Sequence, residues 1–244
     1  MDNGFAPQRF IGVRFDDVDL IRARDAIFAA AGEPCFRYVV TPNVAHLVAI
    51  TEDRAMIQPL FDAAWLSVCD SRVLRRLASV TSDVNMSVVP GSDLTEALLL
   101  GADERGLSIN IIGSFGEDAG VLRQRYPGLR VKYFEAPMGL RRDPKARAEC
   151  VRFALENPAD LTFIGVGMPQ QEMLAHELLQ ADARGIGLCI GASIDFLVGR
   201  QKRAPVWMQK SGLEWAFRLM TDPKRLAKRY LWECPRIFVY AFIK

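Results

Sequence analysis

The sequence lacks the cysteine patterns, apolar runs and glycine loops that mark several protein classes. Its five cysteines include no Cys-x-x-Cys pair and no zinc-ligand spacing, so we expect a reducing, cytoplasmic compartment. No apolar run approaches the roughly 20 residues that a membrane-spanning helix requires. The opening MDNGFAPQRF lacks the basic start and apolar core of a signal peptide. The nucleotide loops GxGxxG and GxxxxGK[ST] are also missing, which weakens the case for NAD or ATP.

The net charge is negative before residue 200 and positive after it. The whole chain has a formal net charge of +2, but residues 200–244 contain eleven Lys or Arg against three Asp or Glu, a net charge of +8. Three of the four tryptophans, Trp207, Trp215 and Trp232, lie in the same segment. Such asymmetry is typical of a protein that meets a polyanion or an anionic membrane, although a solvated helical face would carry the same charges.

Strand and helix patterns alternate through residues 1–199. Short β-branched and aromatic runs predict strands at residues 10–15, 36–40, 64–69, 107–113, 129–134, 160–165 and 186–190. This alternation predicts an α/β fold, with a Rossmann-like, mainly parallel sheet and helices on both faces. We expect a core at residues 1–199 and a helical, basic and aromatic appendage at residues 200–244. No Pro/Gly/Ser-rich linker separates the two, so the appendage is expected to dock on the core.

Polar residues follow several of the predicted strands. Ligands of such sheets bind beyond the carboxyl ends of the strands. Asp70 follows the strand at residues 64–69, where it suits either a helix N-cap or a general base. Thr41 and Asn43 follow the strand at residues 36–40 and suit either helix capping or binding of sugar hydroxyls. Asp195 follows the last strand and either satisfies loop amides or contacts a ligand.

Two glycine turns could hold a phosphate at a helix N-terminus, although each is equally an ordinary tight turn. They are Gly113-x-x-Gly116 and Gly165-x-Gly167. We identify no DxD of the type that holds a sugar-nucleotide diphosphate through a metal, and His46 and His176 are isolated, so we expect no metal site. A bound diphosphate would then require Lys or Arg, which the appendage has in excess.

Four ordered motifs resemble the WecB/TagA/CpsF glycosyltransferase family. They are GVGMPQQE (165–172), GASIDFLVGRQKRAP (191–205), GLEWAFRL (212–219) and DPKRLAKRY (222–230). TPN at 41–43, the strand end at Asp70 and GSDL at 91–94 fall in the matching order. The family includes transferases for teichoic-acid linkage units, such as N-acetylmannosaminyltransferases, for enterobacterial common antigen and for xanthan.

The resemblance implies an inverting, metal-independent and cofactor-free transfer of a sugar from a UDP-sugar to a polyprenyl-diphosphate-linked sugar. The reaction would serve cell-surface polysaccharide synthesis at the inner face of the cell membrane. Asp70 would be the catalytic base, with Thr41 beside the reaction centre. Arg218, Arg225 and Lys228 would close the site and neutralise the leaving diphosphate. The other substrate-binding positions implied by the motifs are Asn43, Gly91, Ser92, Asp93, Gly167, Gln171, Glu172, Asp195 and Arg203.

Three positions depart from the family pattern. Ser71 follows the expected base where the family often has glycine, Val88 stands where an arginine is common, and Gln170 stands where a lysine is frequent. These changes suggest a different sugar or acceptor.

The appendage has two expected roles. Residues 203–229 would complete the site, and residues 230–244 would touch an anionic membrane surface or a neighbouring copy in a homo-oligomer, with no nucleic-acid partner. Two other function classes stay open from the residues alone. They are an NAD-type oxidoreductase on the same kind of sheet and a non-catalytic membrane-surface adaptor.

Overall fold

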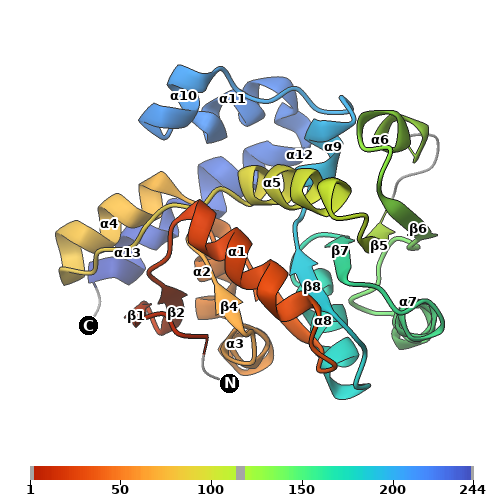
Figure 1. Ribbon diagram of the computed structural model, residues 1–244. Helices are drawn as coiled ribbons and strands as arrows, with labels where there is room; N and C mark the ends of the chain where they lie inside the picture. Colours follow the sequence, from red (N-terminus) through yellow and green to blue (C-terminus); the bar gives the residue numbers. More distant parts are fainter. Residues whose placement is uncertain (1–2, 114–118, 243–244) are drawn as a thin grey trace.

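A six-stranded parallel sheet forms the centre of the computed structural model, which describes residues 3–113 and 119–242 (Figure 1). Its strands are β3 (Arg37–Val40), β4 (Leu66–Ser67), β5 (Ser108–Gly113), β6 (Arg130–Glu135), β7 (Leu161–Gly165) and β8 (Ile186–Cys189). They lie in the order β4–β3–β8–β7–β5–β6, and every neighbouring pair is parallel. The predicted α/β fold with a mainly parallel sheet is therefore confirmed.

The central strands are buried on both faces, which is why they read as nearly continuous apolar runs. All four residues of β8 are buried. Gly187 is required there because a Cβ at this position would lie 2.6 Å from the Phe36 ring. Side chains alternate between two cores, so that Val39 and Leu188 join one and Val40 and Cys189 join the other.

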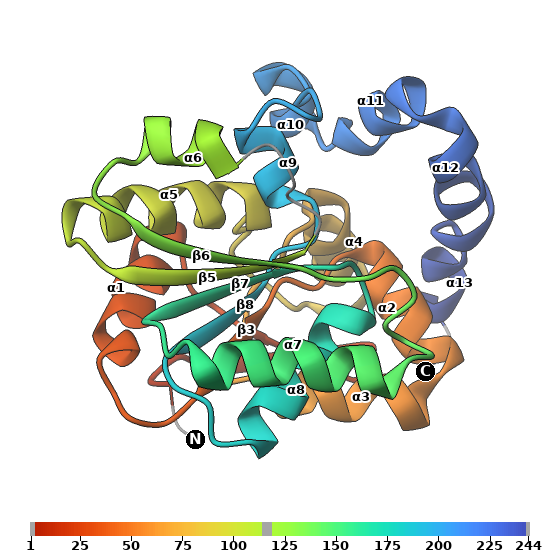
Figure 2. The ribbon, with the colours of Figure 1, turned by 90° about the vertical axis from the view of Figure 1, so that its right-hand side faces the viewer.

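Helices cover both faces of the sheet (Figure 2). One face packs against α2 (Val44–Glu52), α3 (Arg54–Asp62), α7 (Pro144–Glu156) and α8 (Gln170–Gln180). The other packs against α1 (Leu20–Ala31), α5 (Gly91–Glu104), α6 (Ala119–Arg125) and α9 (Ser193–Leu197). A further helix, α4 (Arg72–Ser82), follows β4 directly.

The single strand predicted at residues 10–15 is wrong. These residues belong to an antiparallel hairpin of β1 (Pro7–Phe10) and β2 (Val13–Asp16), which is separate from the main sheet. Ile11 and Gly12 between them have φ values of 51° and 80°. The left-handed conformation at both residues reverses the chain, and the glycine tolerates it without a steric penalty.

The appendage runs along the carboxyl end of the sheet as a series of short helices (Figure 2). They are α10 (Val206–Ser211), α11 (Glu214–Thr221), α12 (Pro223–Ala227), the π-helix η2 (Lys228–Glu233) and α13 (Arg236–Phe242). Helix α13 packs against α2 and α4, where Ile237 is only 1% exposed. Arg236 pairs with Glu52 of α2 at 2.5 Å. Within the residues described, no helix has both the length and the apolar character needed to cross a membrane.

Candidate active site

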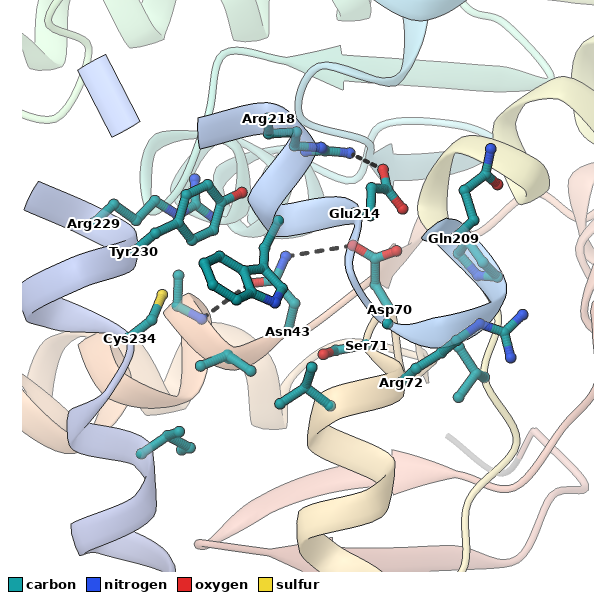
Figure 3. A pocket seen from close by; sticks show the side chains of 18 of the residues that line it. Asn43, Asp70, Ser71, Arg72, Gln209, Glu214, Arg218, Arg229, Tyr230 and Cys234 are labelled. Carbon is teal, nitrogen blue, oxygen red and sulfur yellow. Dashed lines mark hydrogen bonds and ion pairs between the residues drawn. The ribbon is translucent and has the colours of Figure 1, made fainter. Parts of the chain in front are cut away.

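A cavity of about 320 Å³ lies between the core and the appendage, beyond the ends of β3 and β4 (Figure 3). Its size is within the usual range for small-molecule sites. The core contributes Asn43, Val44, Ala45, Asp70, Ser71, Arg72, Val73, Val88, Pro90 and Asp93. The appendage contributes Gln209, Gly212, Glu214, Trp215, Arg218, Arg229, Tyr230, Cys234, Pro235, Ile237 and Phe238. Residues after position 230 therefore help to form the cavity, in addition to the segment 203–229.

Asp70 points into this cavity from the loop after β4 (Figure 3). Its Oδ1 accepts a hydrogen bond from the Gly91 amide at 2.8 Å, and its Oδ2 accepts one from Asn43 Nδ2 at 3.4 Å. The N-cap role that spacing left open for Asp70 belongs to Ser71, whose hydroxyl accepts from the Leu74 amide at 3.2 Å. Because Ser71 caps α4, the carboxylate of Asp70 remains directed toward the site.

Burial raises the pKa of Asp70 to about 6. The Gly91 amide, the charge of Arg218 and the Asn43 amide each lower this pKa, but burial outweighs them. The group is therefore a stronger base than an ordinary aspartate and is still largely ionised at neutral pH. Those two properties suit a general base.

Asn43 caps α2, one of the two roles that its position suggested, and it also contacts Asp70; its binding of sugar hydroxyls stays a prediction. Its Oδ1 accepts from the Ala45 amide at 3.1 Å and caps α2, while its Nδ2 faces Asp70. Thr41 does not line the cavity. Its hydroxyl donates to the Cys189 carbonyl at 3.3 Å and lies against Gly91, where an added Cβ would be 3.2 Å from Thr41 Oγ1. Thr41 therefore packs against Gly91, the residue whose amide binds Asp70 Oδ1.

Arg218 lines the cavity together with Asp70, and its positive charge lowers the pKa of the Asp70 carboxyl group. Its Nη2 lies 2.7 Å from Glu214 Oε1, and its guanidinium carbon lies 4.8 Å from the centre of the Phe196 ring. Nearby, the rings of Trp215 and Tyr230 pack at 6.1 Å between centroids. This part of the wall combines the guanidinium of Arg218 with aromatic surface.

The other predicted cations are distributed differently. Arg203 pairs with Asp93 at the rim of the cavity, with Asp93 among the lining residues. Arg225 pairs with Asp222 at 2.6 Å, and Lys228 pairs with Glu233 at 3.5 Å. Neither Arg225 nor Lys228 is among the residues that line the cavity.

Sequence reasoning missed two cations that do line the cavity, Arg72 and Arg229. Arg72 follows directly after Ser71, so its closeness to Asp70 in the sequence was an available signal. Arg229 follows Lys228, and no sequence pattern distinguished the two.

The remaining motif residues lie after β7 and β8, except for Ser92, which belongs to α5. Gln171 Oε1 accepts from the Gly191 amide at 2.9 Å, and Glu172 is buried at 1% exposure. Asp195 accepts from Gln201 Nε2 at 3.2 Å, and Ser92 is buried in the first turn of α5. Gly167, with φ of 78°, faces open space. None of these five lines the cavity beside Asp70.

Two expectations concern phosphate and metal binding. The turn at Gly113-x-x-Gly116 falls largely on residues 114–118, outside the described residues. Among the residues that are described, no group of three or more His, Cys, Asp or Glu side chains could hold a metal ion. Independence from metal stays a prediction.

The family model described as "Glycosyl transferase WecG/TagA/CpsF family" matches residues 8–244, nearly the whole chain. The match confirms the resemblance carried by the four motifs, and it supports an enzyme of the glycosyltransferase class that acts in cell-surface polysaccharide synthesis. The oxidoreductase and adaptor interpretations do not fit this result.

Proposed function

Because the chain belongs to the glycosyl transferase WecG/TagA/CpsF family, we propose that it transfers a sugar from a UDP-sugar to a polyprenyl-diphosphate-linked sugar with inversion. Asp70 is the general base and no metal takes part. The observation that carries the proposal is the Asp70 carboxylate, which faces a cavity while the Gly91 amide and Asn43 Nδ2 hold its two oxygens.

The reaction is a single displacement. The acceptor hydroxyl gives its proton to Asp70 as its oxygen attacks the anomeric carbon, and the bond from that carbon to the UDP oxygen breaks. The Gly91 and Asn43 hydrogen bonds fix the plane of the carboxylate, so its remaining lone pairs face the acceptor. General-base catalysis of this kind contributes about 10²–10⁴ in rate.

Negative charge that develops on the leaving diphosphate requires a nearby cation. We assign this role first to Arg218, because it lines the cavity and its charge acts on Asp70. Arg72 and Arg229 line the same cavity and are further candidates. Arg225 and Lys228 are assigned to the outer part of the acceptor. Each well-placed group of this kind is worth roughly 10²–10³ in rate.

The two substrates approach from different sides in this proposal. The donor lies across the loops after β7 and β8, where Gly167 and Gly191 leave room for close approach of a ligand. The leaving diphosphate reaches Arg218 from the β8 side, where Arg218 lies over the Phe196 ring, and the acceptor lies in the cavity along the appendage wall, which includes Trp215, Tyr230 and Phe238. Aromatic faces of this kind suit the sugar ring and the first part of the lipid.

The membrane would hold the acceptor, so the enzyme has to work at a membrane surface. Exposed apolar side chains of the appendage suit that location, together with its net charge of +8. They include Val206, Trp207, Met220, Leu231, Trp232, Val239 and Phe242. We propose peripheral association with the inner face of the cell membrane.

Asp70→Asn tests the catalytic assignment. The amide keeps the shape of the side chain but cannot accept a proton, so transfer is expected to fall by about 10²–10⁴ while the UDP-sugar still binds. The assay is release of UDP with a panel of UDP-sugars and a lipid-diphosphate-sugar acceptor. The matched control is Glu149→Gln, an exposed carboxylate on α7, which should leave turnover unchanged. Turnover near that of the wild type in Asp70→Asn would remove Asp70 from the mechanism.

A further inference from the structure

We infer that His46 is a positioning residue for the transfer, because it links the Asn43–Asp70 pair to the Gly191 loop through buried polar contacts. The inference rests on the proposed role of Asp70. His46 was an isolated histidine in the sequence, and neither its spacing nor the family motifs assigned it a function.

The first half of the link lies at the start of α2. His46 occupies the third position of the helix, and its Nδ1 accepts a hydrogen bond from the Asn43 amide at 3.2 Å. Asn43 Oδ1 is engaged by the Ala45 amide at 3.1 Å, so only the NH₂ end of that side chain is left for Asp70. These reciprocal bonds form a capping box, with histidine in the position usually taken by Glu or Gln. The capping box therefore fixes which end of the Asn43 amide faces the carboxylate.

The second half of the link crosses the interior to the donor side. His46 Nε2 lies 3.8 Å from Glu172 Oε1, which also accepts a hydrogen bond from Gln171 Nε2 at 2.8 Å. The other end of the Gln171 amide accepts from the Gly191 backbone at 2.9 Å. One series of contacts thus joins the loops after β3, β4 and β8, which belong to different parts of the proposed site.

The tautomer of His46 follows from its contacts. Since Nδ1 accepts a hydrogen bond, the ring proton is on Nε2, which faces the Glu172 carboxyl group. Burial, helped by the charge of Arg229, lowers the pKa of His46 to about 3, so the ring is neutral. Burial also raises the pKa of Glu172 to about 7. Glu172 Oε2 has no hydrogen-bond partner among the described residues. Burial of a polar pair such as His46 and Glu172 costs free energy, and apolar side chains could pack in the same place without that cost. The pair is therefore better explained by a role in positioning.

Packing and hydrogen bonding at His46 can be separated by two substitutions. The ring meets Phe61 edge to face, with 5.8 Å between the centroids. His46→Phe keeps an aromatic ring there but removes the acceptor for the Asn43 amide. His46→Gln loses the ring but supplies the side-chain oxygen that a capping box ordinarily uses.

The two variants are assayed for transfer in the full chain, with Asp70→Asn alongside. We expect His46→Phe to lower kcat by about 10- to 100-fold with little change in KM for either substrate, because Asp70 is misplaced after the substrates bind. His46→Gln is expected to recover kcat to within about threefold of the wild type, since it restores the capping contact.

Equal losses in both variants, or full kcat in His46→Phe, would overturn the inference. Normal transfer by Asp70→Asn would instead overturn the proposed function, so the two failures are distinguishable.

A second measurement, of the tautomer of His46, does not depend on how the His46 variants fold. The chain has two histidines, so imidazole ¹⁵N shifts can be assigned by substitution of His176. A neutral Nε2–H tautomer for His46 at pH 7 is expected, and an Nδ1–H tautomer or a charged ring would contradict the link.

Discussion

At Asp70, burial and hydrogen bonding act on the carboxyl group in opposite directions. Burial favours the neutral acid, while the Gly91 amide, Arg218 and Asn43 favour the carboxylate. The resulting pKa of about 6 leaves the carboxyl group largely ionised at neutral pH and gives the proposed mechanism a lower pH limit.

The proposed mechanism predicts an acid limb in the pH profile of kcat/KM. The active form of Asp70 is the carboxylate, so activity is present above its pKa and lost as the pH falls through about 6. Below that value kcat/KM should fall about tenfold per pH unit. Initial rates between pH 4.5 and 9 would check this.

Arg218→Met supplies a directional control for the pH profile. The positive charge of Arg218 lowers the pKa of Asp70, so its removal should move the acid limb to higher pH and also reduce the rate. A limb that stays in place in this variant would show that another group controls it.

Which residues lie near the site could be predicted from the sequence better than what each of them does there. The strand end at Asp70 was evident from the sequence, but spacing could not tell which of Asp70 and Ser71 caps α4, because both side chains can accept from a helix amide. Arg229, rather than Lys228, lines the cavity, and both residues belong to a stretch that forms a π-helix. The side chains that face inward from a π-helix differ from those of an α-helix, and no local sequence pattern predicted this geometry.

At the scale of elements, α13 attaches the end of the appendage to the core. Ile237 is buried against α2 and α4, while Val239, two residues later on the same helix, is 57% exposed. Because Ile237 and Phe238 also line the cavity, the docking of α13 and the shape of the cavity depend on the same contacts.

Ile237→Ala should therefore reduce stability and activity together. Loss of a buried isoleucine side chain commonly costs about 2–5 kcal/mol in the free energy of unfolding, with the lower part of that range expected at the edge of a core. Val239→Ala is the matched control and should change the stability by less than about 0.5 kcal/mol. Chemical denaturation and kcat/KM would be measured for both. Similar effects in the two variants would contradict the docking role of Ile237.

The central strands of the sheet were predictable because parallel strands buried on both faces are nearly continuous apolar runs, and the edge strand β6 was predictable from its β-branched and aromatic residues. The exception is the N-terminal segment, where apolar residues continue across Ile11 and Gly12 and conceal the turn of the hairpin. The path of the appendage was not predictable either. Its helices are short, and their arrangement depends on tertiary contacts such as Ile237 with α2 rather than on periodicity.

For the whole molecule, charge and exposed apolar surface coincide in one segment. The appendage carries a net charge of +8 while the core carries −6, and it exposes Leu231 and Trp232 at 62% and 68%. An exposed apolar side chain adjoining basic residues is suited to insertion at the headgroup level of an anionic membrane. The same apolar residues also suit contact with a second copy of the chain. Association of two copies weakens on dilution, whereas membrane binding depends on the lipid, so the two kinds of partner can be distinguished.

The double variant Leu231→Ser/Trp232→Ser distinguishes membrane binding from binding of a second copy of the chain. If these residues meet the membrane, binding to vesicles that contain phosphatidylserine should weaken by at least about tenfold, because two large apolar groups no longer leave water. Turnover of a water-soluble acceptor analogue should stay near the wild-type value. Val80→Ser/Met138→Ser removes two exposed apolar groups of the core, 82% and 95% exposed, and should leave vesicle binding unchanged. A lower sedimenting mass with unaltered vesicle binding in the appendage variant would assign the surface to a neighbouring subunit instead.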